Sequence, residues 1–161
     1  MPIKKIFYTG DTHYKYLHKM VETKPSRVFI STYGFYGGGG PASSAVVSLL
    51  NYLTNTGVKV DVLIGVPRLN TFKSQNAYYD YVVRLKKSTR RWREVNWRFS
   101  SANHLKLVGF AKGAKLLSCV VGGRNLTDGK STDLSMAITG ASLKSIEKFF
   151  YKHFNAASKS I

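Results

Sequence analysis

The amino-acid sequence predicts a single α/β domain over residues 1–161, with a mixed, mostly parallel sheet of about six strands and helices on both faces. Apolar residues make up 43% of the chain, which is enough for a core and argues against disorder. Short runs of β-branched and aromatic residues alternate with helical patterns. Residues 27–64 have the strand–helix–strand pattern of a right-handed crossover between parallel strands.

Strands and helices are expected to alternate in the first half of the chain. Strands are assigned where β-branched and aromatic residues cluster, and helices where apolar residues recur at helical spacing behind a capping side chain. Pro25 stops the first helix, and Gly57 ends the second as a left-handed cap. The expected elements are a strand at 3–8, a helix from Asp11 or Thr12 to about Thr23, a strand at Arg27–Tyr33, a helix from Ser43 or Ser44 to about Asn55 and a strand at Val58–Ile64.

An antiparallel hairpin is expected in the second half. The sequence from Asn103 alternates as a strand does, and residues 111–114 supply a turn. The apolar run after that turn therefore returns beside the first strand. The expected elements are a helix at Thr71–Lys87, strands at Asn103–Phe110, Lys115–Val121 and Leu134–Thr139, and a helix from Ser142 to about Phe154.

The charge balance is strongly basic, with 25 Lys and Arg against 8 Asp and Glu and a formal net charge of +17. This excess predicts a polyanionic partner, with nucleic acid first and an anionic membrane surface second. No apolar run is long enough to span a membrane, and the N-terminus lacks a signal-peptide pattern, so we expect a cytoplasmic protein without a membrane partner. The single cysteine, Cys119, lies in an apolar run and is expected to be a buried, inert thiol.

Residues 84–98 are a candidate phosphate-binding segment. They contain seven basic residues, two tryptophans and one acidic residue. Basic side chains neutralise phosphates and aromatic rings stack on unpaired bases, so we expect Arg90, Arg91 and Arg93 to contact substrate. The alternative interpretation is a solvated helix end with two tryptophans in the core.

A glycine-rich segment precedes the second helix. Residues 34–41 contain five glycines, and Gly38 and Gly39 can bring backbone N–H groups close to a phosphate at the helix N-terminus. The segment lacks the Gly-Lys-Ser/Thr ending of a Walker A loop. A flexible connection between strand and helix is the alternative.

The residues best suited to chemistry lie between positions 104 and 133. In a strand, His104 and Lys106 share one face about 7 Å apart. Asp133 follows as a carboxylate that can orient the imidazole. The hairpin is expected to bring beside His104 the residues Gly122, Gly123, Arg124 and Asn125, which offer anion-binding backbone and side-chain donors. Together these groups suit phosphodiester chemistry without a metal, although His104 as a solvent-exposed strand histidine is the alternative.

The other histidines and the acidic residues do not form a recognisable metal site. His13, His18 and His153 are expected to be surface or packing residues, because no pair has metal-ligand spacing. The carboxylates form no compact cluster for two-metal chemistry. We therefore expect no metal and no cofactor.

The order His-x-Lys, hairpin, Gly-Gly-x-Asn and downstream acid resembles the phospholipase D superfamily. His104, Lys106, Gly122, Gly123 and Asn125 match its signature. The resemblance is to nuclease-type members with a single His-x-Lys, such as small bacterial endonucleases and the catalytic domain of metal-independent restriction endonucleases. It covers roughly residues 27–138 in pattern. It departs from the family at Ala111, where an Asp is expected, and in a longer segment between Lys106 and Gly122.

The resemblance implies a phospholipase D/nuclease-like fold and a metal-independent endonuclease that works through a covalent phosphohistidine at His104. Lys106 and Asn125 would hold the non-bridging oxygens, and Asp133, or else Asp128, would orient the imidazole. This chemistry needs a second histidine, which a homodimer partner would supply. DNA is favoured over RNA as the substrate, with weak sequence specificity.

Two alternative functions remain at this stage. One is a phospholipase or phosphatidyl transferase of the same superfamily, which would need an acyl-binding surface that the sequence does not reveal. The other is a catalytically dead nucleic-acid-binding protein on the same scaffold. A dead scaffold would be expected if the motif residues were broken, whereas His104, Lys106 and Asn125 are intact, and the basic charge favours a nuclease.

Overall fold

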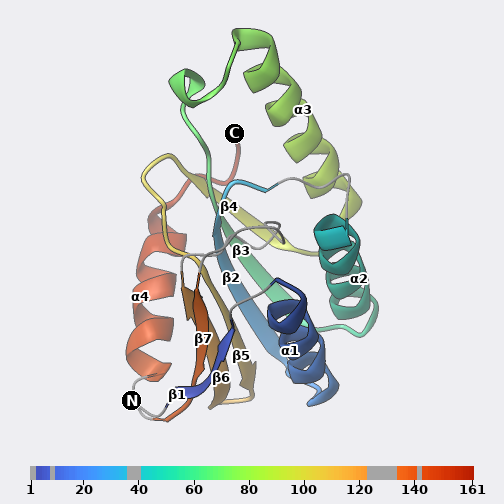
Figure 1. Ribbon diagram of the computed structural model, residues 1–161, viewed down its shortest axis with the longest axis vertical. Coiled ribbons are helices and arrows are strands. Elements are labelled where there is room, and N and C mark those ends of the chain that lie inside the picture. Colours follow the sequence, from blue (N-terminus) through green and yellow to red (C-terminus); the bar gives the residue numbers. More distant parts are fainter. Residues whose placement is uncertain (1–2, 8–9, 36–40, 123–133, 141–142) are drawn as a thin grey trace.

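The computed structural model describes residues 3–7, 10–35, 41–122, 134–140 and 143–161. Figure 1 shows one central sheet with helices on either side. The elements are β1 (Ile3–Phe7), α1 (Gly10–Glu22), β2 (Arg27–Tyr33), α2 (Pro41–Asn55), β3 (Lys59–Gly65), a 3-10 helix (Leu69–Thr71), α3 (Gln75–Arg91), β4 (Asn96–Ser100), β5 (Leu107–Lys112), β6 (Lys115–Gly122), β7 (Ser135–Ile138) and α4 (Leu143–Ala156).

The sheet corrects the fold class expected from the sequence. Seven strands lie in the order β1-β7-β6-β5-β2-β3-β4. Only β2–β3 and β3–β4 are parallel, whereas β1–β7, β7–β6, β6–β5 and β5–β2 are antiparallel. A mostly parallel sheet of about six strands, as in the expected phospholipase D/nuclease-like fold, is therefore wrong. The parallel crossover of β2, α2 and β3 and the β5–β6 hairpin are present as expected.

The expected number and direction of the strands were wrong for two physical reasons. The first three residues of β4 belong to the basic segment at residues 84–98, whose many charges hide the short alternating pattern of this strand. The pairings of β1 with β7 and of β2 with β5 join segments far apart in sequence, and local periodicity carries no information about strand direction across such pairs.

The core has two layers because consecutive strand residues point to opposite faces. Val28 and Ile30 of β2 join the cluster that α1 and α2 cover, while Phe29 joins the cluster under α4. α1 and α2 lie on one side of the sheet and α4 on the other (Figure 1). The central strands β2 and β3 are buried on both faces, which explains why their interior residues are mostly apolar.

A polar network joins α4 to the sheet. Arg27 forms an ion pair with Glu147 and donates through Nη1 to the Tyr151 hydroxyl at 2.9 Å. The Tyr151 hydroxyl donates to Asp61 Oδ2 at 2.5 Å, and Asn96 Nδ2 donates to Asp61 Oδ1 at 3.1 Å. Asp61 is only 1% exposed, so these donors stabilise a buried carboxylate. Burial and the hydrogen bond to Asp61 raise the pKa of Tyr151 above its ordinary value.

Replacement of Tyr151 by Phe should destabilise the fold, because Asp61 loses a donor while it stays buried. We expect the free energy of unfolding, measured in urea, to fall by about 1–3 kcal/mol. The raised pKa means that the protonated phenol contributes stability that is present below pH ~10 and is lost as the pH rises through the folded-state value. The difference between wild type and Tyr151→Phe should therefore shrink above about pH 10. Tyr79→Phe, at an exposed tyrosine, is the control, and a constant difference across this pH range would contradict the assignment.

Candidate functional site

His104 and Lys106 lie in a loop between β4 and β5, and not in a strand as their alternation predicts. β5 begins at Leu107, and residues 103–106 have no regular secondary structure. The physical reason is Asn103, whose side-chain oxygen accepts from the Leu105 backbone N–H at 3.3 Å and replaces a strand partner. The two residues still lie together, because Lys106 Nζ donates to the His104 carbonyl oxygen at 2.8 Å.

The loop is fastened to β2 by buried polar contacts. Ser31 Oγ donates to the Leu105 carbonyl at 2.8 Å, and Asn103 Nδ2 donates to Ser31 Oγ at 3.0 Å. Ser31 is 2% exposed and Asn103 is 8% exposed. Gly65, at the end of β3, makes room for the loop, since a Cβ there would lie 2.0 Å from the Asn103 carbonyl oxygen. The backbone that carries His104 is thus fixed from two neighbouring strands.

Tyr33 supports both side chains of the His104 loop. The rings of His104 and Tyr33 stack with centroids 4.0 Å apart and planes 22° apart. Lys106 Nζ lies 5.7 Å from the centroid of the same tyrosine ring, which is a cation–π distance. His104 is exposed and Lys106 is half-buried. An imidazole and an ammonium from the same loop therefore both lie against the ring of Tyr33.

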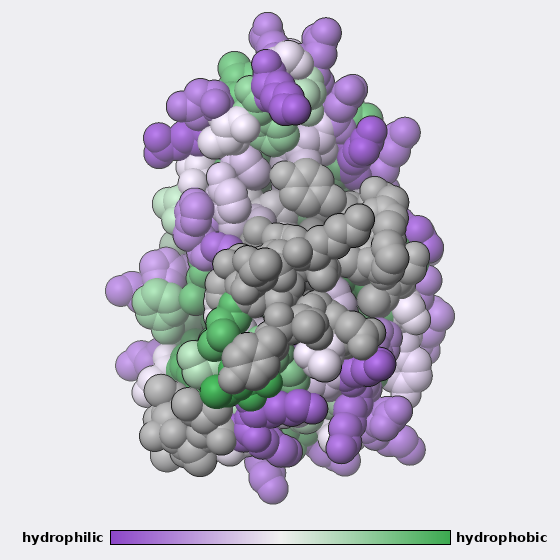
Figure 2. Space-filling view, in the orientation of Figure 1, coloured by the Kyte–Doolittle hydropathy of each residue, from purple (hydrophilic) through white to green (hydrophobic). Residues whose placement is uncertain are grey.

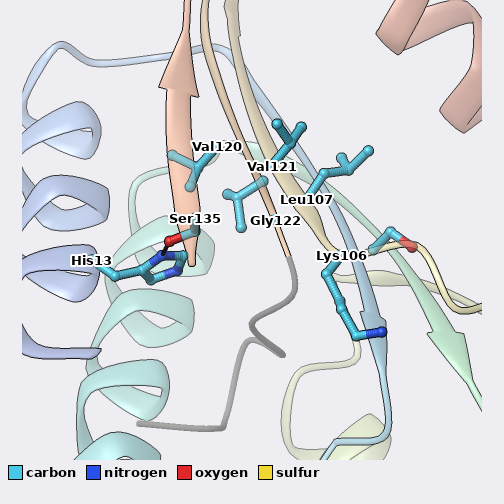
Figure 3. A pocket seen from close by; sticks show the side chains of 9 residues that line it. His13, Lys106, Leu107, Val120, Val121, Gly122 and Ser135 are labelled. Carbon is cyan, nitrogen blue, oxygen red and sulfur yellow. Dashed lines mark hydrogen bonds between the residues drawn. The ribbon is translucent and has the colours of Figure 1, made fainter. Parts of the chain in front are cut away.

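A second histidine borders this region from the other side. His13 of α1, Lys106, Gly122 and Ser135 line one small pocket at the end of the β5–β6–β7 ladder. Figure 3 shows the His13 ring and Ser135 on one side of the pocket and the Lys106 side chain on the other, with its ammonium directed away from His13. His13 is 4% exposed, and its Nδ1 lies 2.9 Å from Ser135 Oγ.

Sequence reasoning assigned His13 to the surface or to packing and missed its place near Lys106. No spacing rule could reveal it, because long-range contacts bring α1 to the site, among them the pairing of its neighbour β1 with β7 and the hydrogen bond between Tyr16 and Ser118. Ser31, Tyr33 and Asn103 were missed as well. Asn103 carried a usable signal, since asparagine favours local backbone hydrogen bonds over strand pairing.

The remaining predicted site residues fall into three groups. Gly122 ends β6, where a Cβ would lie 2.3 Å from the Leu134 carbonyl oxygen. Arg90 and Arg91 end α3, and Arg93 follows it, with all three exposed. The others lie outside the described residues, namely Gly38, Gly39, Gly123, Arg124, Asn125, Asp128 and Asp133.

The basic segment forms an exposed surface on and just after α3. Its tryptophans are core residues, with Trp92 2% and Trp97 8% exposed. Hydrophilic side chains follow α3 from the top of the molecule down its right-hand edge (Figure 2). In this segment, within the part of the chain that the structure describes, only Arg93 has an acidic partner, with its Nε 3.5 Å from Glu94. The exposed cations are Arg84, Lys86, Lys87, Arg90, Arg91 and Arg93.

Metal sites, membrane-spanning helices and a reactive cysteine were also considered among the described residues. Within them, no group of three or more His, Cys, Asp or Glu side chains is placed to hold a metal ion. Within the same ranges, no helix has the length and apolar character needed to cross a membrane. Cys119 is 1% exposed, and burial raises its pKa to about 12, so it has no thiolate character near neutral pH.

Comparison with known proteins yields a structural likeness. No protein-family model matches the chain, and no curated protein matches it in sequence. The fold resembles that of TrmBL2, an archaeal chromatin protein. The match has a TM-score of 0.57 and 10% sequence identity, and it covers 96% of this chain and 53% of the TrmBL2 chain. The present chain thus spans about half the length of that protein, whose structure is described as showing a novel mode of DNA binding. At this identity the likeness concerns the fold alone.

Substitution of Gly65 by Ala tests whether β3 positions the His104 loop. A Cβ at this position would be 2.0 Å from the Asn103 carbonyl oxygen and 2.8 Å from Tyr33 Cδ2, so the loop must move. We expect the free energy of unfolding to fall by about 1–3 kcal/mol. The ring-proton NMR signals of His104 should shift, while those of His18 on α1 should not. Unchanged His104 signals would contradict this role of Gly65.

Proposed function

We propose that this domain binds nucleic acid. The observation that carries the proposal is the surface of six exposed cations on and after α3, in a chain with a formal net charge of +17. Among the described residues, five of these six cations have no acidic partner. Lysine and arginine side chains release the counterions of the phosphates that they neutralise, which favours binding to any polyanionic strand. DNA is the favoured partner, and the likeness in fold to a chromatin protein described as binding DNA supports this choice.

The proposed interface should be visible in the salt dependence of binding. Arg90→Ala with Arg91→Ala removes two exposed cations, so the slope of log K against log salt concentration should become shallower by about 2. Fluorescence anisotropy with a labelled DNA duplex and a labelled single strand measures this slope.

The matched control is Lys112→Ala with Lys115→Ala, which removes the same charge from the exposed turn between β5 and β6. This control should bind with the wild-type slope if contacts are made through α3. Equal losses in the two double variants would instead indicate a diffuse field without an α3 contact. Absence of binding by the wild type at low salt would refute the proposal.

A second candidate function is metal-independent hydrolysis of phosphodiester bonds at His104. The specific observation in its favour is the exposed His104 imidazole, which lies against the same Tyr33 ring as the Lys106 ammonium, while His13 lines a pocket that Lys106 shares. The resemblance to single His-x-Lys members of the phospholipase D superfamily supports this candidate through the His-x-Lys motif alone, and not through the fold.

The proposed reaction has two displacements at phosphorus. A His104 ring nitrogen attacks phosphorus as the bond to the leaving oxygen breaks, and a second histidine gives that oxygen a proton. The second histidine then takes a proton from water, whose oxygen attacks phosphorus and releases His104. Lys106 stabilises charge on the non-bridging oxygens. The second histidine is either His104 of a homodimer partner or His13 of the same chain.

Cleavage of plasmid DNA and of a single-stranded oligonucleotide in excess EDTA tests this candidate. We expect wild type to cut and His104→Ala to lose cutting by at least ~100-fold, because general acid–base and nucleophilic roles each contribute that much or more. His18→Ala, at a half-buried histidine of α1, is the control. If His13→Ala also loses cutting and sedimentation shows a monomer, the second histidine is His13 of the same chain. If His13→Ala keeps its activity and sedimentation shows a dimer, the second histidine is His104 of the partner. Binding without cutting by wild type would leave only the binding function.

A further inference from the structure

A cavity of about 250 Å³ lies between α4 and the loop that carries His104. In Figure 1 this loop, drawn in yellow, lies above the end of α4. Loop residues Ala102, Asn103 and Leu105 form one wall, and Phe149 and His153 of α4 form another. Leu105 packs into the cluster under α4, while its neighbour His104 stacks on Tyr33. One loop therefore borders both the cavity and the candidate site.

Phe149 gives this cavity an exposed aromatic edge. Its side chain is 51% exposed, although phenylalanine is ordinarily a core residue. Its ring lies 4.5 Å from that of His153, with the two planes 62° apart. These two rings offer a flat ligand a stacking surface and a polar ring nitrogen at the mouth of the cavity.

Charge around the cavity favours an anionic ligand. The Arg98 guanidinium lies 5.1 Å from the ring of Phe154, next to His153 along α4. Lys152 and Lys159 are exposed nearby in sequence. The acidic groups of this region are already engaged, since Glu147 pairs with Arg27 and Asp61 accepts from Tyr151.

We infer that this cavity receives a single unpaired nucleobase, and that the domain consequently prefers single-stranded to double-stranded nucleic acid. The inference rests on the proposed binding function and names the form of its ligand. The walls are mostly apolar, with polar groups from Ser100, Asn103 and His153. The cavity is slightly smaller than the roughly 300–1,000 Å³ typical of pockets for drug-sized ligands, so it suits one flat ring system better than a whole nucleotide.

The physical basis is base stacking combined with phosphate neutralisation. A base in a duplex keeps its faces stacked on its neighbours and cannot enter a cavity without first being extruded. An unpaired base has both faces free, and stacking on a protein aromatic ring is tolerant of base identity. The flanking phosphates would then lie near Arg98 and Lys152, whose charges are sequence-neutral. This arrangement predicts preference for strandedness without preference for sequence.

The test measures affinity for three labelled strands of about 12 nucleotides by fluorescence anisotropy. They are a single strand, the blunt duplex of the same sequence and an abasic strand that keeps every phosphate. Phe149→Ala should weaken single-strand binding about tenfold, in line with the usual contribution of one stacked base. It should leave duplex and abasic binding unchanged. Single strands of DNA and of RNA are compared, because the same chemistry serves both.

Two further variants separate stacking from fold effects. Phe149→Trp keeps an aromatic face and should retain wild-type affinity, with its indole fluorescence quenched when the single strand binds. Tyr52→Ala removes an aromatic side chain of similar exposure, 47%, from α2 and should bind all three strands as wild type does. Thermal melting of each variant verifies the fold.

The failures of the two proposals are distinguishable. If wild type binds none of the strands, the proposed nucleic-acid-binding function fails. If wild type binds the strands and Phe149→Ala matches it on all of them, the nucleobase site is overturned while nucleic-acid binding stands. If Phe149→Ala instead converts a dimer to a monomer in sedimentation, with affinity unchanged, the face is a contact between copies of the chain and the inference is equally overturned.

Discussion

The contact between Ser31 and Asn103 is the constraint on which the candidate site depends. Ser31 lies in β2, a strand buried on both faces, and Asn103 lies in a connection that has no ladder partners of its own. Their side chains supply hydrogen bonds to the loop in place of those that regular strand pairing would supply. Because the loop is short and fixed at both Asn103 and Leu105, the position of His104 between them follows directly. A site on a loop thus acquires the rigidity of the sheet below it.

Local signals predicted the parts of the fold that are made locally. The β2–α2–β3 crossover and the β5–β6 hairpin were predictable because a helix pattern flanked by strands, and a short turn between strands, each leave few ways to connect. The sheet as a whole was not predictable in this way. β1 reaches its partner β7 from the opposite end of the chain, and β5 joins β2 in the antiparallel sense. Both pairings depend on how the whole sheet packs against the helices on its two faces. The residue pattern of a single segment does not contain this information.

The candidate site shows the same division. His104 and Lys106 were selected as candidates from the motif, and the structure places both in one loop, whereas the sequence predicted a strand. A tyrosine ring from β2 and an asparagine side chain bring the two groups together instead. His13 could not be predicted, because its approach to Lys106 depends on the β1–β7 pairing and not on sequence distance. Candidate functional residues can be selected from a sequence, whereas their arrangement in space depends on contacts between distant segments.

The uneven use of charge explains why the surface is so basic. Two of the few acidic residues are committed to the fold: Asp61 is buried beneath Tyr151 and Asn96, and Glu147 pairs with Arg27 where α4 meets the sheet. They stabilise packing and neutralise little of the exposed surface. The cations on and after α3 consequently repel one another. This repulsion lowers the stability of the folded state relative to the unfolded chain, in which the charges are farther apart. A bound polyanion would offset this repulsion only in the folded state, where the cations are gathered, so that binding and folding stabilise each other by linkage. The same charge excess that costs stability in the free domain would then supply the proposed affinity for a phosphate chain.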